Sequence, residues 1–140
     1  MSTDKFGFFI EDITFNPPSI TVVAPWIQQV IQQEDYQLEC LNFIFCSDKY
    51  LHAINMQYLQ HDTLTDVITF DHTETPQTVF GDVYISIERV KDNATTYACG
   101  FEQELHTVMA HGVLHLLGYK DKTPQEQANK RVQAQACLSL

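Results

Sequence analysis

The feature that most constrains the fold of this chain is an apolar run near its carboxyl end that contains two histidines. Residues 108–117 read VMAHGVLHLL, which is apolar on nearly every side of a helix. A helix that is apolar all round is normally buried. The pattern therefore predicts a buried helix, within a longer helix over 101–117, that carries His111 and His115.

The two histidines are four residues apart, so a helix places both imidazoles on one face, about one turn apart. Gly118 can then adopt a left-handed conformation and turn the chain back toward the helix. Asp121 follows this turn. The pattern H-x-x-x-H-x-x-G-x-x-D offers two imidazole nitrogens and a carboxylate, which suits zinc and leaves a fourth position for water. We therefore predict one zinc ion per chain, held by His111, His115 and Asp121, and a hydrolytic site.

Other interpretations of this pattern stay open at this point. Both histidines can be hydrogen-bonded core residues, with Gly118 only ending the helix, although burying two imidazoles without a shared purpose is costly. Asp121 lies between Lys120 and Lys122 and can simply be solvated.

Gly112 separates two classes of zinc hydrolase. In peptidases with the motif H-E-x-x-H, a Glu directly after the first His is the general base. Gly112 occupies that position here and has no proton acceptor in its side chain. A peptidase of this class is disfavoured, and a zinc hydrolase of an amide or ester substrate is kept only as an alternative.

Length and composition indicate an ordinary globular protein. The 140 residues fit one domain over 1–140, and they contain no internal repeat or linker-like segment. No apolar run approaches the roughly 18 residues of a membrane helix, and no secretory signal is visible. The four cysteines form no C-x-x-C pair, which favours reduced thiols. We therefore expect a cytoplasmic protein without a membrane partner.

Apolar periodicity and turn residues predict a β-α-β-α-β-β-α-α-α order of elements. Strands are expected over 6–15, 37–46, 65–70 and 81–87. Helices are expected from Pro25 to about 33, from the N-cap Ser47 to about 60, over 88–98 and 101–117, and from the capping box at 123–126 to about 137. This order predicts a single α/β or α+β domain, a small mixed sheet packed with helices.

Three blocks of sequence resemble one known family. The stretch HGVLHLLGYKD at 111–121 resembles the H-G-x-L-H-L-x-G-Y-D-H signature of the YbeY family of bacterial metal-dependent endoribonucleases. NMQY at 55–58 followed by TDVITF at 65–70 is similar to the family's N-x-x-Y…T-D-V-L-S-F segment. GDVYIS at 81–86 resembles its G-D-I-x-I-S strand, and the blocks occur in the family's order.

The resemblance implies a zincin-like metal hydrolase fold with zinc at the three signature positions. It also implies cleavage of single-stranded RNA, in maturation of ribosomal RNA at the 3′ end of the small-subunit rRNA and in ribosome quality control. Ribosomal RNA and the ribosome or its proteins are the implied partners, in the cytoplasm, and DNA is not among them. No catalytic side chain is assigned beyond the metal ligands.

Two positions depart from the family pattern. Asp121 stands where the family usually has a third His, and a carboxylate is still a competent zinc ligand. Leu59 stands where the family usually has an Arg directly after the Tyr of the second block. Candidate cations in its place are His61, Lys120 and Lys122. These departures keep open a non-catalytic, ribosome-associated zinc protein as an alternative.

Other polar residues have both a functional and a structural interpretation. Asp66 and Asp82 can face the site or be solvated at strand ends. Thr65 and Thr69 can bind substrate or pack as β-branched strand residues. His106 has no partner at ligand spacing, so we expect it at the surface or the edge of the core.

The formal net charge of −10 argues against a nucleic-acid partner, because phosphates are bound by excess Lys and Arg. However, the charge is unevenly distributed. Residues 1–99 contain 14 acids and 4 bases, whereas residues 100–140 contain 4 of each. The segment that carries the predicted site is therefore neutral. We expect RNA affinity that is local, metal-centred and modest, or assisted by the ribosome or a protein partner.

Overall fold

A four-stranded mixed sheet forms the centre of the computed structural model, which describes residues 5–59, 65–118 and 125. The strands are β1 (Phe6–Ile10), β2 (Gln37–Cys46), β3 (Val67–Asp71) and β4 (Thr78–Ser86). Their order in the sheet is β1-β2-β4-β3. β2 pairs in parallel with both β1 and β4, and β3 pairs antiparallel with β4 at the edge of the sheet.

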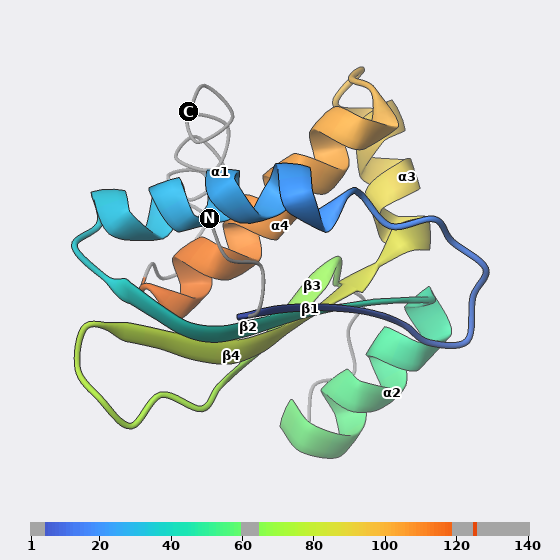
Figure 1. Cartoon of the computed structure of the whole chain (residues 1–140). Helices are drawn as coiled ribbons and strands as arrows, with labels where there is room; N and C mark the ends of the chain where they lie inside the picture. Colours follow the sequence, from blue (N-terminus) through green and yellow to red (C-terminus); the bar gives the residue numbers. More distant parts are fainter. Residues whose placement is uncertain (1–4, 60–64, 119–124, 126–140) are drawn as a thin grey trace.

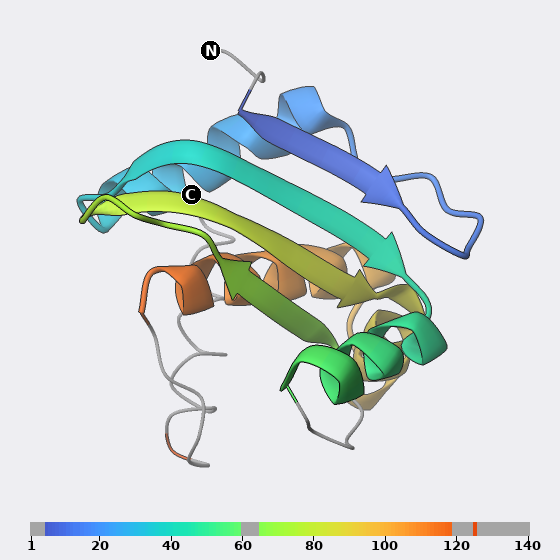
Figure 2. The ribbon, with the colours of Figure 1, turned by 90° about the horizontal axis from the view of Figure 1, so that it is seen from below.

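Helices cover both faces of the sheet (Figures 1 and 2). The described helices are α1 (Ile20–Gln33), α2 (Asp48–Leu59), α3 (Ile87–Thr96) and α4 (Phe101–Leu116). Figure 1 shows α1 and α4 on one face and α2 on the other. This arrangement confirms the predicted small α+β domain. In the described part of the chain no helix is long and apolar enough to cross a membrane. The predicted helix from 123 to about 137 lies outside the described residues, apart from residue 125.

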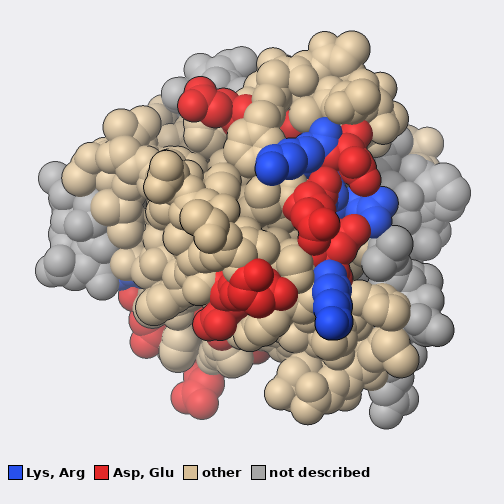
Figure 3. Space-filling view, turned by 90° about the vertical axis from the view of Figure 1, so that its right-hand side faces the viewer, with Lys and Arg blue, Asp and Glu red and all other residues tan. Residues whose placement is uncertain are grey.

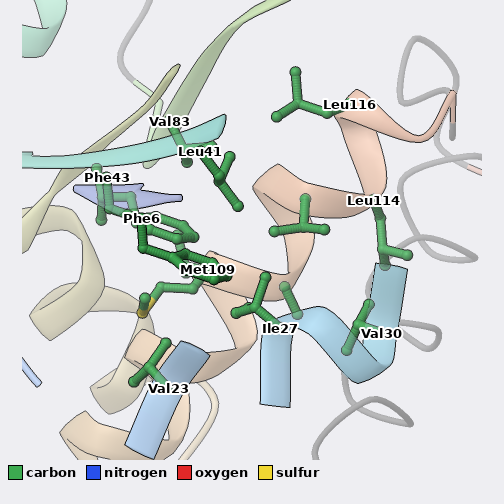
Figure 4. Close-up of a cluster of buried hydrophobic side chains, with 14 of the residues drawn as sticks. Phe6, Val23, Ile27, Val30, Leu41, Phe43, Val83, Met109, Leu114 and Leu116 are labelled. Carbon is green, nitrogen blue, oxygen red and sulfur yellow. The ribbon is translucent and has the colours of Figure 1, made fainter. Parts of the chain in front are cut away.

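The main core lies between the sheet and the pair α1 and α4 (Figure 4). Alternation along β2 and β4 directs one set of side chains toward the two helices, because successive strand residues point to opposite faces. The set from the sheet includes Leu41, Phe43, Phe45, Val83 and Ile85, all inaccessible to solvent. Burial of these side chains against α4 holds that helix on the sheet.

The start of α1 was predicted wrongly. The helix begins at Ile20, five residues before Pro25, and the proline lies inside it. The N–H groups of Val22 and Val23 donate to the carbonyl of Ser19 at 3.1 and 3.0 Å, so a first turn forms before the proline. Proline removes only one N–H donor from the helix. Burial of the apolar stripe that includes Val23 and Ile27 offsets this loss.

β1 is shorter than the predicted strand over 6–15. Asp12 adopts a left-handed backbone conformation with φ of 46°, which turns the chain out of the sheet. Its carboxylate accepts hydrogen bonds from the Ser47 hydroxyl at 2.6 Å and from the Ser47 N–H at 3.1 Å. Phe15 consequently leaves the sheet and packs against Phe101 of α4, with ring centroids 6.1 Å apart.

The cysteines that the structure describes are free thiols, as expected: Cys40, Cys46 and Cys99. Burial, with a smaller contribution from nearby carboxylates, raises the pKa of the Cys46 thiol to about 12. A thiol in this state stays protonated and is a poor nucleophile. Cys46 therefore acts as an apolar side chain in the small cluster that it forms with Leu51 and Ile68 between α2 and the sheet.

An ion pair links the first turn of α2 to α3. Arg89 donates from Nη2 to Asp48 Oδ2 at 2.6 Å, and the Ser86 hydroxyl donates to Asp48 Oδ1 at the same distance. Partial burial favours the neutral acid, but the hydrogen bonds from Arg89 and Ser86 outweigh it. They hold the pKa of Asp48 below its ordinary value. A carboxyl whose pKa is lowered by folding stabilises the fold above its unfolded pKa and loses this effect as the pH falls.

Replacing Asp48 by Asn is therefore expected to lower the free energy of unfolding at pH 7 by about 1–2 kcal/mol. The difference from the wild type should shrink as the pH falls below about 4, where the unfolded carboxyl, and then the folded one, is protonated. Urea unfolding at several pH values measures this. Asp92→Asn is a matched control, because Asp92 is 71% exposed and lies 3.9 Å from the same arginine. Equal losses in the two variants would contradict the role of Asp48.

Candidate metal centre

The apolar segment of α4 leaves only its two histidines accessible. Every other residue from Val108 to Leu117 is buried, whereas the His111 side chain is half-buried and His115 is exposed. The helix thus buries its apolar surface on all sides except the stripe that bears the imidazoles. This confirms the predicted helix and places both rings on one accessible face, as joint binding of one ion requires.

Gly112 lets α4 approach the sheet closely. A Cβ at this position would lie 2.6 Å from Cγ1 of Val83 and 3.3 Å from Cγ2 of Val67. Gly112 therefore lies on the side of α4 that faces the sheet, away from the side that bears the two histidines. A Glu here would not only be sterically excluded but would also be directed away from a metal held by His111 and His115. Packing thus provides a second reason for the absence of the peptidase motif.

The helix ends as the sequence predicts. Leu117 N–H donates to the Val113 carbonyl at 3.0 Å, and Gly118 then adopts the left-handed conformation with φ of 101°. A side chain with a Cβ rarely adopts this conformation, so glycine permits the turn. Asp121 lies outside the described residues. Within the described part of the chain, no group of three or more His, Cys, Asp or Glu residues could hold a metal.

A residue of β3 contacts one of the predicted ligands. The hydroxyl of Thr69 is hydrogen-bonded to Nδ1 of His115. Thr69 is paired with Val83 of β4, so its side chain points to the same face of the sheet as Val83, toward α4. From the sequence, Thr69 can bind substrate or pack as a β-branched strand residue, and neither interpretation includes this bond. The one sequence signal that could have indicated it is the alternation along the strand, which places Thr69 on the same face as the apolar Val67.

Two carboxylates considered from the sequence have other partners. Asp66 accepts a hydrogen bond from the side-chain amide of Asn93 at 2.9 Å, which ties the start of β3 to α3. Asp82 accepts from Asn42 at 3.0 Å and pairs with His72 at 3.0 Å. Asp82 directly precedes Val83, so its side chain lies on the sheet face opposite α4.

His106 and Leu59 are further candidates that the structure describes. His106 lies at the edge of the core, as expected, with its ring 5.4 Å from that of Trp26. Burial lowers the pKa of His106 below its ordinary value, against the opposing effect of Glu102. Leu59 is the last residue of α2. The candidate cations His61, Lys120 and Lys122 lie outside the described residues.

These features define a class of protein. A small α+β domain with a buried helix that exposes two imidazoles one turn apart, followed by a glycine turn, is typical of metal-dependent hydrolases. A family model described as endoribonuclease YbeY matches residues 12–139. The chain belongs to the YbeY endoribonuclease family, whose members are metal-dependent nucleases.

Individual relatives cover nearly the whole chain. An endoribonuclease YbeY of Amoebophilus asiaticus is 60% identical over 124 residues, which are 89% of this chain and 84% of the relative. One of Cytophaga hutchinsonii is 44% identical over 140 residues, 100% of this chain and 98% of the relative. The solution structure of TM1509 from Thermotoga maritima matches with a TM-score of 0.63 and 27% identity, covering 95% of this chain and 88% of that one.

Proposed function

We propose that this chain is a zinc-dependent, single-strand-specific endoribonuclease. It acts in maturation of ribosomal RNA, at the 3′ end of the small-subunit rRNA, and in ribosome quality control in the cytoplasm. Family membership supports the nuclease activity. The observation that supports a metal site is the accessible face of α4. Within the segment 108–117, His111 and His115 have the only accessible side chains.

The ligand set proposed for the ion is His111, His115 and Asp121. Two neutral imidazoles and one carboxylate match the donors that zinc prefers, and three protein ligands leave a position open. Bound zinc would supply Lewis-acid chemistry that activates water and stabilises negative charge at a phosphodiester. The chain itself contributes the placement of the two imidazoles, through the close packing of Gly112 on β4 and the hydrogen bond between the Thr69 hydroxyl and Nδ1 of His115.

Charge limits how the RNA can be bound. On the side of the molecule drawn in Figure 3, Lys and Arg side chains alternate with Asp and Glu, and the described residues there form no broad basic surface. Affinity that depends on many phosphate contacts needs such a surface. Because the formal net charge of the whole chain is also −10, we place RNA binding locally at the metal site, with His61, Lys120 and Lys122 as the nearest candidate cations in sequence. The ribosome or one of its proteins supplies the remaining affinity.

Removal and restoration of the metal test this proposal. The purified protein should contain about one zinc per chain by elemental analysis. It should cleave a single-stranded RNA and leave a duplex of the same sequence intact. Treatment with a chelator should abolish cleavage, and added zinc should restore it, because the bound ion would again supply the Lewis-acid chemistry.

Two outcomes would favour the alternatives. If chelation lowers the melting temperature while ribosomal particles are bound and no RNA is cleaved with zinc present, the metal is structural and the protein is a non-catalytic module. If a generic peptide or ester substrate is cleaved while RNA is untouched, the site belongs to another hydrolase class. Full RNA cleavage by the metal-free protein would contradict zinc dependence directly.

A further inference from the structure

The contact between β3 and the carboxyl-terminal half of α4 bears directly on one proposed ligand. Thr69 lies on the edge strand, and its hydroxyl is hydrogen-bonded to Nδ1 of His115. The two residues are 46 positions apart in the sequence, so only the packing of α4 on the sheet brings them together. The imidazole of His115 lies on the exposed side of the helix, where the hydrogen bond to Thr69 restricts the rotamers that the side chain can adopt.

A neutral imidazole can bind a metal through only one of its two nitrogens, and the other then carries the proton. Histidine ligands usually donate this proton to an oxygen acceptor, which selects the tautomer and orients the ring. The Thr69 hydroxyl oxygen is such an acceptor and lies at Nδ1. The hydroxyl can accept from Nδ1–H or donate to a bare Nδ1, and only the first arrangement leaves Nε2 unprotonated and able to bind the ion.

We propose that Thr69 is a positioning residue that holds the His115 ring in the Nδ1–H tautomer, with Nε2 directed to the metal. This inference rests on the proposed function, since it takes His115 to be a ligand. Thr69 does not touch the metal or the substrate in this role. It acts through His115 alone.

The surrounding packing explains how a strand residue can have this role. Thr69 is paired with Val83, and Val83 is the residue that meets Gly112 of α4. The close approach at Gly112 thus sets the height of α4 above β3, three residues before His115. Threonine suits the position because its branched Cβ restricts rotation about χ1, which keeps the hydroxyl aimed at the helix.

Zinc affinity measured by competition with a chromogenic chelator tests the proposal. Thr69→Val keeps the shape of the side chain and removes the hydroxyl, and it should weaken zinc binding about 10–100-fold. Thr69→Ser keeps the hydroxyl and should remain within a few-fold of the wild type. Thr95→Val is the matched control, because Thr95 is exposed on α3 and its hydroxyl donates to the Lys91 carbonyl.

A spectroscopic measurement on the metal-free protein and its Thr69 variants reports the tautomer directly, because no metal then fixes the position of the proton. Long-range proton–nitrogen correlation spectra distinguish Nδ1–H from Nε2–H imidazoles. The spectrum of His115 should show the Nδ1–H form in the wild type and in Thr69→Ser, and a mixture of both forms in Thr69→Val. A purely structural role for Thr69 would leave the tautomer unchanged.

The results separate this inference from the proposed function. If the wild type binds zinc and Thr69→Val binds it equally tightly, or if His115 is in the Nε2–H form, the role of Thr69 is overturned and the zinc site stands. If the wild type binds no zinc at all, the proposed function fails, whatever the tautomer of His115.

Discussion

Replacing either His111 or His115 by Ala should abolish zinc binding at stoichiometric concentrations and reduce RNA cleavage to background. Each variant removes one of three proposed ligands, so zinc affinity should fall by more than the roughly 100-fold expected for loss of a residue that only orients a ligand. Both imidazoles lie on the accessible face of α4, and their removal leaves the buried apolar surface intact. Circular dichroism should therefore show a folded protein, and elemental analysis should show less than one zinc.

His106→Ala is the matched control for this prediction. His106 lies on the same helix, but its ring packs against Trp26 at the other side of α4. This variant should retain one zinc and cleave RNA. The third ligand is tested in the same series, because Asp121→Ala should weaken zinc binding and Asp121→His should restore it with the donor usual in the family. Undiminished zinc content in both His111→Ala and His115→Ala would contradict the assigned site.

Gly112→Ala is expected to destabilise the protein although alanine is the better helix former. The added Cβ would lie 2.6 Å from a methyl group of Val83, which is fully buried and cannot move into solvent. Overpacking of this kind costs about 1–3 kcal/mol, whereas the gain in helix propensity is about 1 kcal/mol. We expect a net loss of up to about 2 kcal/mol in the free energy of unfolding, together with weaker zinc binding as α4 is displaced from β3. Urea denaturation measures the first effect and chelator competition the second.

Two further variants show whether the contact with Val83 is the cause. At Gly100 a Cβ would meet nothing within 4 Å, so Gly100→Ala should change stability less than Gly112→Ala. Val83→Ala opens space beneath the helix. The double variant with Gly112→Ala should therefore be more stable than the sum of the two single losses predicts, with a coupling of about 1 kcal/mol or more. If the losses of the two single variants simply add in the double variant, the contact with Val83 is not the cause of the destabilisation by Gly112→Ala.

Elements with strong local patterns could be predicted closely from the sequence. β2 has the predicted bounds, Gln37–Cys46, because its apolar side chains and flanking turns define a strand without reference to other segments. The Ser47 hydroxyl accepts a hydrogen bond from the Tyr50 N–H at 3.1 Å, as expected of an N-cap for α2. The spacing of His111 and His115 likewise determines a shared helix face.

Elements that depend on distant contacts were predicted less well. The end of β1 is set by the bond of Asp12 to Ser47, 35 residues away, and no local signal marks it. The start of α1 depends on burial of a stripe that includes Ile27, which compensates for a proline inside the helix. Local propensity is a weak determinant wherever such tertiary contacts are available.

The sequence by itself determined the donors of the proposed site, since a residue type and its helical spacing are local properties. Only the tertiary structure decided how the imidazoles of His111 and His115 are held. In the sequence, Gly112 is notable only because it occupies the position of the catalytic Glu of zinc peptidases. In the structure, it is the point at which α4 contacts Val83. The sequence identifies Thr69 only as a residue of a strand, whereas the packing of α4 on the sheet brings its hydroxyl within hydrogen-bonding distance of His115. The orientation of a ligand depends on contacts between segments far apart in the chain, and no local pattern encodes it.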